Sequence, residues 1–95
     1  MEKFIVRSEK AGVFYGEIES RKGDEVIMTG VIRLWRWAGA RSLSQLAQEG
    51  TKSKDECCFA VPVSRIVVFG VIEILTTTSA AQKSIESVPP WKITK

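Results

Sequence analysis

The sequence predicts a small α+β domain, in which a mainly antiparallel β-sheet of about five strands is combined with two short helices. Short segments of alternating apolar and polar residues, rich in Val, Ile and aromatic residues, are separated by glycine-containing turns, which is typical of antiparallel strands. Two Ser-x-x-Gln sequences have the spacing of a helix capping box. Because 95 residues suffice for one hydrophobic core, we expect residues 1–95 to form a single domain.

The first part of the chain is predicted to form strands. Residues 3–7 are a short strand candidate, and residues 12–30 alternate around an Arg21-Lys22-Gly23-Asp24 turn, which predicts a β-hairpin. Gly30 is expected to mark a β-bulge or a break between two strands. Residues 31–37 continue as extended chain, which would place Ile32, Leu34 and Arg36 on one face and Val31, Arg33, Trp35 and Trp37 on the other.

The middle of the chain combines a helix with further strands. Ser42 begins a capping box, so a helix is predicted to start there and to end at Gly50. Residues 51–56 are a polar loop, and residues 57–63 predict a strand whose Pro62 favours an edge position. Residues 66–75 are the segment richest in β-branched residues, so we expect the central strand there.

The C-terminal part is predicted to contain the second helix. Ser79 with Gln82 repeats the capping signature, and the helix should end near Val88, before Pro89-Pro90. Trp91 follows on the tail, from where it could hold the C-terminus on the body or reach a neighbouring subunit.

The residue types present argue against an enzyme. Without histidine there is no Ser-His-Asp or Cys-His pair and no ordinary general base near neutral pH, and no phosphate-binding glycine-rich motif occurs. The adjacent Cys57 and Cys58 are expected to be reduced, to point to opposite sides and to serve structure. Two sulfurs without histidine fall short of a zinc shell, so neither a metal site nor a cofactor is expected.

Hydropathy and charge predict a cytoplasmic protein outside the membrane. The longest apolar stretch, residues 66–75, is interrupted by Gly70 and Glu73 and is far shorter than the ~20 residues that span a bilayer. The charged N-terminal segment does not resemble a signal peptide. The net charge of +3, from 14 basic and 11 acidic residues, is low for a dedicated nucleic-acid-binding protein.

Residues 33–45 contain the strongest candidate for a binding site. Guanidinium groups match phosphate oxygens, indole rings stack on nucleobases, and a helix start favours an anion. The candidate ligand-binding residues are Arg33, Trp35, Arg36, Trp37, Arg41, Ser42, Ser44 and Gln45, with Tyr15 added from the hairpin. A structural interpretation competes with this one. The tryptophans could belong to the core, and the capping box alone explains Ser42, Ser44 and Gln45.

The pattern Arg-Leu-Trp-x-Trp-x-Gly-Ala-x-Ser-Leu-Ser-Gln-Leu-Ala at residues 33–47 resembles a group of short proteins encoded by tailed phages and prophages. The likeness extends over nearly the whole chain, although Arg36 departs from the polar or aromatic residue usual between the two tryptophans. The resemblance implies a genomic context rather than an activity. In that context we expect a counter-defence protein, a homo-oligomer that sequesters a cyclic nucleotide immune signal. An inhibitor of a host protein and a nucleic-acid-binding accessory protein remain the alternatives.

Overall fold

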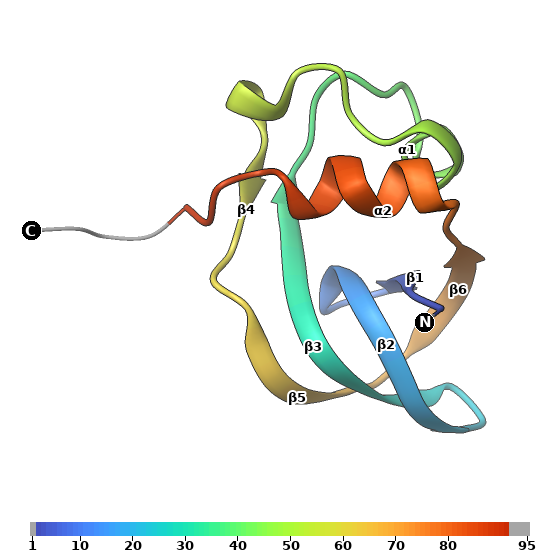
Figure 1. Cartoon of the computed structure of the whole chain (residues 1–95). Coiled ribbons are helices and arrows are strands. Elements are labelled where there is room, and N and C mark those ends of the chain that lie inside the picture. The colour runs from blue at the N-terminus through green and yellow to red at the C-terminus, as the bar shows by residue number, and fades with distance from the viewer. Residues whose placement is uncertain (1, 92–95) are drawn as a thin grey trace, which may run out of the picture.

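The computed structural model describes residues 2–91 and confirms a small α+β fold with a mostly antiparallel sheet (Figure 1). It has six strands rather than about five, and two α-helices. The elements, in chain order, are β1 (Phe4–Ser8), β2 (Gly12–Lys22), β3 (Glu25–Arg36), α1 (Leu43–Glu49), a 3-10 turn (Lys54–Glu56), β4 (Cys58–Phe59), β5 (Val63–Val68), β6 (Val71–Thr76) and α2 (Ser79–Glu86).

The sheet curls into a partly closed barrel. Strands β1, β2 and β3 form an antiparallel meander, and the free side of β3 pairs with β5 along its first half and with β4 near its end. Strand β6 pairs with the opposite edge, on β1. Because only Phe69 and Gly70 separate β5 from β6, the two ends of the sheet are drawn towards each other (Figure 1).

Two hydrophobic cores lie on opposite faces of this sheet. The inner core, inside the curl, consists of Val6, Phe14, Val26, Met28, Val31 and Val68. The outer core lies between the sheet and the two helices, and it consists of Ile5, Tyr15, Leu34, Leu46, Ala47, Cys57, Phe59, Ile85 and Val88. Adjacent residues of β1 and β2 therefore alternate between two buried environments, which explains why these strands are apolar on both faces.

A β-bulge at Gly30 reverses the alternation of β3. Tyr15 pairs with Ile32 and Glu17 with Thr29, so that two residues of β3, Gly30 and Val31, lie opposite Gly16 alone. Gly30 has a φ of 56°, a left-handed conformation that glycine adopts without strain. The bulge expected from the sequence is confirmed.

The consequence of this bulge is a change of face within one strand. Met28 and Val31 both reach the inner core, although an even alternation would separate them, and Leu34 then faces the outer core. Arg33 and Trp35 consequently follow Val31 onto the inner side of the sheet.

Two strand predictions were wrong. Residues 57–63 do not form one strand, because β4 stops at Phe59 and Pro62 lies between β4 and β5. Residues 66–75 are not a central strand: Gly70, with a φ of 70°, forms a corner between β5 and β6. Each of these strands pairs along one side only within the described sheet.

The helix predictions were closer. Ser42 caps α1 by accepting a hydrogen bond from the Gln45 backbone N–H at 3.1 Å, and Gly50 ends the helix as predicted. Helix α2 is capped by Thr78 rather than Ser79 and ends at Glu86, before the expected Val88. Among residues 2–91, neither helix is long and apolar enough to cross a membrane.

Candidate functional site

The structure divides the predicted site between two faces of the sheet. Leu34 pairs with Phe59 and Arg36 with Cys58, so Trp35 is an additional residue in β3 without a paired partner in β4. This second irregularity reverses the alternation again. Trp35 is 61% exposed, whereas Trp37 packs against the outer core. The expectation that Trp35 and Trp37 share one face was therefore wrong, and so was the interpretation of Trp35 as a core residue.

Trp35 belongs to an exposed aromatic surface completed by the C-terminal tail. Its ring stacks on that of Trp91, with centroids 4.8 Å apart and planes 20° from parallel, and Trp91 is 60% exposed. The tail is held in place, because the Trp91 backbone N–H donates to the Phe59 carbonyl at 2.8 Å. Arg33, Trp35, Ala60 and Trp91 line a shallow cavity of about 210 Å³, and we call these four residues the tryptophan face.

Arg33 is fixed in position beside the indoles. Its guanidinium carbon lies 4.6 Å from the centre of the Phe14 ring, and Nη1 donates to the Ala11 carbonyl at 2.8 Å. Within residues 2–91, neither Arg33 nor the exposed Arg36 forms an ion pair. Their positive charges are thus not neutralised by an ion pair with a described residue.

Three of the remaining predicted residues line a different cavity. Trp37, Ser42 and Ser44 line a space of about 360 Å³, which is also bordered by Arg7 and Glu73. The donors expected there are partly occupied: the Gln45 N–H bonds to Ser42 Oγ, and the Arg41 N–H donates to Gln45 Oε1 at 2.8 Å. The structural interpretation as a helix cap accounts for Ser42 and Gln45, and the charge of Arg7 at the rim is offset by its ion pair with Glu73 at 3.8 Å.

Tyr15 does not lie at either surface. It is buried to 1% exposure in the outer core, and its hydroxyl donates to Glu86 Oε2 at 2.6 Å. Lys3 Nζ donates to the same oxygen at 2.7 Å, so the residue before β1, strand β2 and helix α2 meet at Glu86. Tyr15 therefore attaches the end of α2 to the sheet, and its place among the candidate ligand-binding residues is not supported by the geometry.

The contact between Tyr15 and Glu86 shifts their pKa values in opposite directions. Burial, and then the Glu86 carboxylate, raise the pKa of Tyr15 well above its ordinary value. The hydrogen bond from Lys3, and then that from Tyr15, lower the pKa of Glu86 below 4.5. A carboxyl with a lowered folded-state pKa stabilises the fold above its unfolded pKa, and this contribution is lost as the pH falls further.

We expect Glu86→Gln to reduce the free energy of unfolding at neutral pH by no more than about 1 kcal/mol, since the partly exposed ion pair is screened by solvent. Because protonation of Glu86 removes the same charge, the difference between the two proteins should shrink as the pH falls from the unfolded-state pKa of Glu86 through its lowered folded-state pKa. Urea unfolding of both proteins at neutral and acidic pH measures it. A difference that is equal at both pH values would show that the charge of Glu86 does not contribute.

The two adjacent cysteines differ in burial. Cys57 is buried, Cys58 is half-buried, and both are free thiols. Cys57 Sγ lies among polar groups of the neighbouring loop, accepting from the Ala38 N–H at 3.4 Å. No cluster of three or more potential metal ligands occurs among residues 2–91.

Sequence reasoning overlooked one surface. A cavity of about 460 Å³ lies between the β1–β2 turn and the end of β5, and it is lined by Glu9, Lys10, Ala11, Val67, Phe69 and Gly70. Alternation along residues 66–75 gave no sign of it, because Phe69 reads as a core residue of a central strand. In the structure Phe69 precedes the corner at Gly70 and is 65% exposed.

A family model described as Domain of unknown function (DUF6948) matches residues 1–85, so the chain belongs to this family. No curated protein and no solved structure showed a significant match to the chain.

Proposed function

We propose that this member of the DUF6948 family is a non-catalytic binding protein, which holds the base of a phosphate-bearing nucleotide on the tryptophan face. The stacked and largely exposed pair of Trp35 and Trp91 carries the proposal. Large apolar side chains are usually buried, so two exposed indoles held in one place call for a partner. Indole faces stack on nucleobases, with ~1–3 kcal/mol gained per base.

Arg33 and Arg36 supply the phosphate contacts in this proposal. Guanidinium groups bind phosphate oxygens through paired hydrogen bonds, and in the chain Arg33 lies two residues before Trp35 and Arg36 directly after it. Arg33 is already held by Phe14 and the Ala11 carbonyl, so little side-chain entropy remains to be lost when a ligand binds.

The shape of the tryptophan face bears on oligomerisation. Its cavity of about 210 Å³ is smaller than the ~300–1,000 Å³ of typical ligand pockets, so one copy of the chain covers only one side of a nucleotide. A second copy placed over this face would enclose the ligand, which agrees with the homo-oligomer expected from the sequence. Native mass spectrometry would report the oligomeric state together with any nucleotide that co-purifies.

The biological role that we propose is counter-defence in the cytoplasm of an infected host. The resemblance of residues 33–47 to short tailed-phage proteins supports this role. A protein without histidine can remove an immune signal by holding it, which requires affinity and no reaction. Sequestration therefore fits both the aromatic surface and the missing catalytic groups.

Isothermal titration calorimetry of the intact protein tests the proposal. Cyclic dinucleotides, cyclic ADP-ribose isomers and the common mononucleotides are titrated separately at moderate salt. We expect at least one of them to bind with micromolar or tighter affinity and to be recovered unchanged. Absence of binding throughout the panel, or conversion of the ligand, would contradict the proposal.

One observation favours the alternative of a host-protein inhibitor. Val61 and Val63 are each 46% exposed and follow Ala60 of the tryptophan face, which extends its apolar surface. Exposed apolar surface next to tryptophan and arginine is typical of protein interfaces. Val61→Asp separates the two functions, because it should abolish binding to a protein while leaving the nucleotide titration unchanged.

A further inference from the structure

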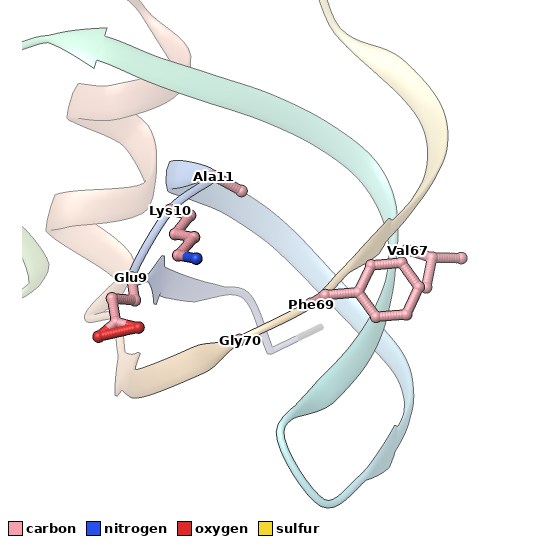
Figure 2. Close-up of a pocket in the computed structure, with 6 residues that line it drawn as sticks. All are labelled: Glu9, Lys10, Ala11, Val67, Phe69 and Gly70. Atoms are coloured by element: carbon pink, nitrogen blue, oxygen red, sulfur yellow. The ribbon is translucent and has the colours of Figure 1, made fainter.

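The cavity beside the β1–β2 turn has the features of a second aromatic binding position. Figure 2 shows Phe69 and Val67 on the β5 side of this cavity and Lys10 on the opposite side, at the turn. The Phe69 ring is largely exposed, and Lys10 is an exposed cation that forms no ion pair within residues 2–91. This cavity therefore combines an aromatic ring with a cation, as the tryptophan face does.

The backbone around Phe69 is held firmly in place. Ser8 Oγ, almost completely buried, donates to the Phe69 carbonyl at 2.7 Å. The Glu9 backbone N–H donates to the Gly70 carbonyl at 3.0 Å, which ties the β1–β2 turn to the corner. Hydrogen bonds therefore fix the backbone of Phe69, whose side chain is exposed and does not belong to the inner core.

Arg33 connects this cavity to the tryptophan face. Its Nη1 bonds to the carbonyl of Ala11, which lines the cavity, while Arg33 itself lines the tryptophan face. The two aromatic positions are therefore parts of one surface, with Arg33 between them and Lys10 at its side. Glu9 adds one negative charge at the margin of the cavity, where its carboxylate is directed away from Phe69 (Figure 2).

We propose that the ligand is a linear oligonucleotide or single strand, with one base on the tryptophan face, a second on Phe69 and the phosphates between them on Arg33 and Lys10. This inference rests on the proposed function, and it names the class of ligand. Single-stranded nucleic acids bind to surfaces that alternate stacking rings with cations, because every base has a ring face and every linkage a charge. A mononucleotide would leave Phe69 and Lys10 unused.

An open surface also favours a linear ligand over a cyclic dinucleotide. The two aromatic positions border separate, shallow cavities rather than one enclosed pocket. A cyclic dinucleotide holds its two bases at a spacing fixed by the ring, whereas a linear strand adapts its spacing to the surface. Once the first base of a linear strand is bound, the second base is held near Phe69. Its stacking there raises the affinity of the whole strand without any change at the tryptophan face.

The test compares ligands of increasing length on the intact protein. Fluorescence anisotropy is measured with end-labelled oligothymidylates and oligouridylates of one, two, four and eight nucleotides, and cyclic dinucleotides compete for the same surface. We expect affinity to rise at least tenfold between one and four nucleotides, and to fall steeply with added salt for the longer ligands. The DNA and RNA series show which sugar the surface prefers.

Two variants locate the second position. Phe69→Ala should weaken binding of the four-nucleotide ligand by about 5- to 150-fold, the loss expected for one stacked base, while binding of the single nucleotide is unchanged. Lys10→Ala should reduce both the affinity for longer ligands and the slope of its salt dependence. Ile72→Ala is the matched control, since Ile72 is 56% exposed on β6 and lines neither cavity.

The outcomes separate this inference from the proposed function. If single nucleotides bind but greater length adds nothing, or Phe69→Ala leaves the affinity for longer ligands unchanged, the linear ligand is wrong and the proposed function survives. If cyclic dinucleotides bind more tightly than every linear ligand, the linear ligand is again wrong. If no nucleotide of any length binds, both are wrong, and a protein partner becomes the better explanation of the exposed Phe69.

Discussion

Replacing Trp35 by alanine should weaken nucleotide binding by about 5- to 150-fold, because the variant loses the face on which the base stacks. The protein should remain folded, since the side chain is 61% exposed and contributes to neither core. Trp91→Ala should have a smaller effect of the same kind, because Trp35 keeps its place in β3 when its stacking partner is removed. Calorimetry with the best ligand of the panel measures both.

The matched control is Trp37→Phe. Trp37 lies two residues from Trp35 but packs against the outer core, so phenylalanine preserves most of its contacts. Its nucleotide affinity should equal that of the natural protein. A Trp35→Ala variant that binds normally, or a Trp37→Phe variant that loses binding while its melting temperature is unchanged, would show that the site lies elsewhere.

Gly50→Ala should reduce the free energy of unfolding by about 2–5 kcal/mol. Gly50 has a φ of 77°, which costs other residues about 1–2 kcal/mol, and a Cβ there would overlap the Ser84 side chain of α2. Ser84 cannot simply rotate away, because its Oγ bonds to both the N–H and the carbonyl of Thr51. Urea unfolding measures the loss.

Gly23→Ala provides the comparison for this substitution. Gly23 also has a positive φ, of 61°, but no atom lies within 4 Å of the position of its Cβ. It should lose only the ~1–2 kcal/mol that the backbone conformation costs. Equal losses of unfolding free energy in the two variants would mean that Gly50 does not pack closely against Ser84 of α2.

Local sequence signals were sufficient wherever neighbouring residues determine the structure. The hairpin follows from alternation around Gly23, and the start of α1 follows from the hydroxyl of Ser42 and its bond to Gln45. Helix α2 shows the limit of such signals. Thr78 and Ser79 both carry a hydroxyl that could cap the helix. Thr78 is the cap in the structure, and its Oγ1 also donates a hydrogen bond to the Gln48 carbonyl of α1.

The arrangement of the strands depended on contacts between distant residues. The segment rich in β-branched residues suggested a central strand, yet such residues also suit strands that cover an inner core along the edge of a curled sheet. Gly70 was visible in the sequence, but whether a glycine interrupts a strand or turns a corner depends on what pairs on either side. Strands β3 and β1, which receive β5 and β6, lie far away in the chain.

The spatial arrangement of the candidate residues differs from the one that the sequence predicted. The sequence pointed to residues 33–45 as one surface, on the assumption that alternation continues through Trp35. Two irregularities in β3, at Gly30 and Trp35, each reverse the alternation, and the second one separates Trp35 from Trp37. Phe69 was missed for the related reason that its exposure arises from a corner rather than from its own residue type.

The indole N–H signals of the three tryptophans provide the most direct test of the central claim that a nucleotide binds on the tryptophan face. In ¹H–¹⁵N correlation spectra of the intact protein, each tryptophan gives one such signal, and the Trp35→Ala and Trp91→Ala variants identify which is which. During titration with the tightest nucleotide, the signals of Trp35 and Trp91 should shift while that of Trp37 stays in place. A shift confined to Trp37, or no shift of any of the three under saturating ligand, would contradict the claim.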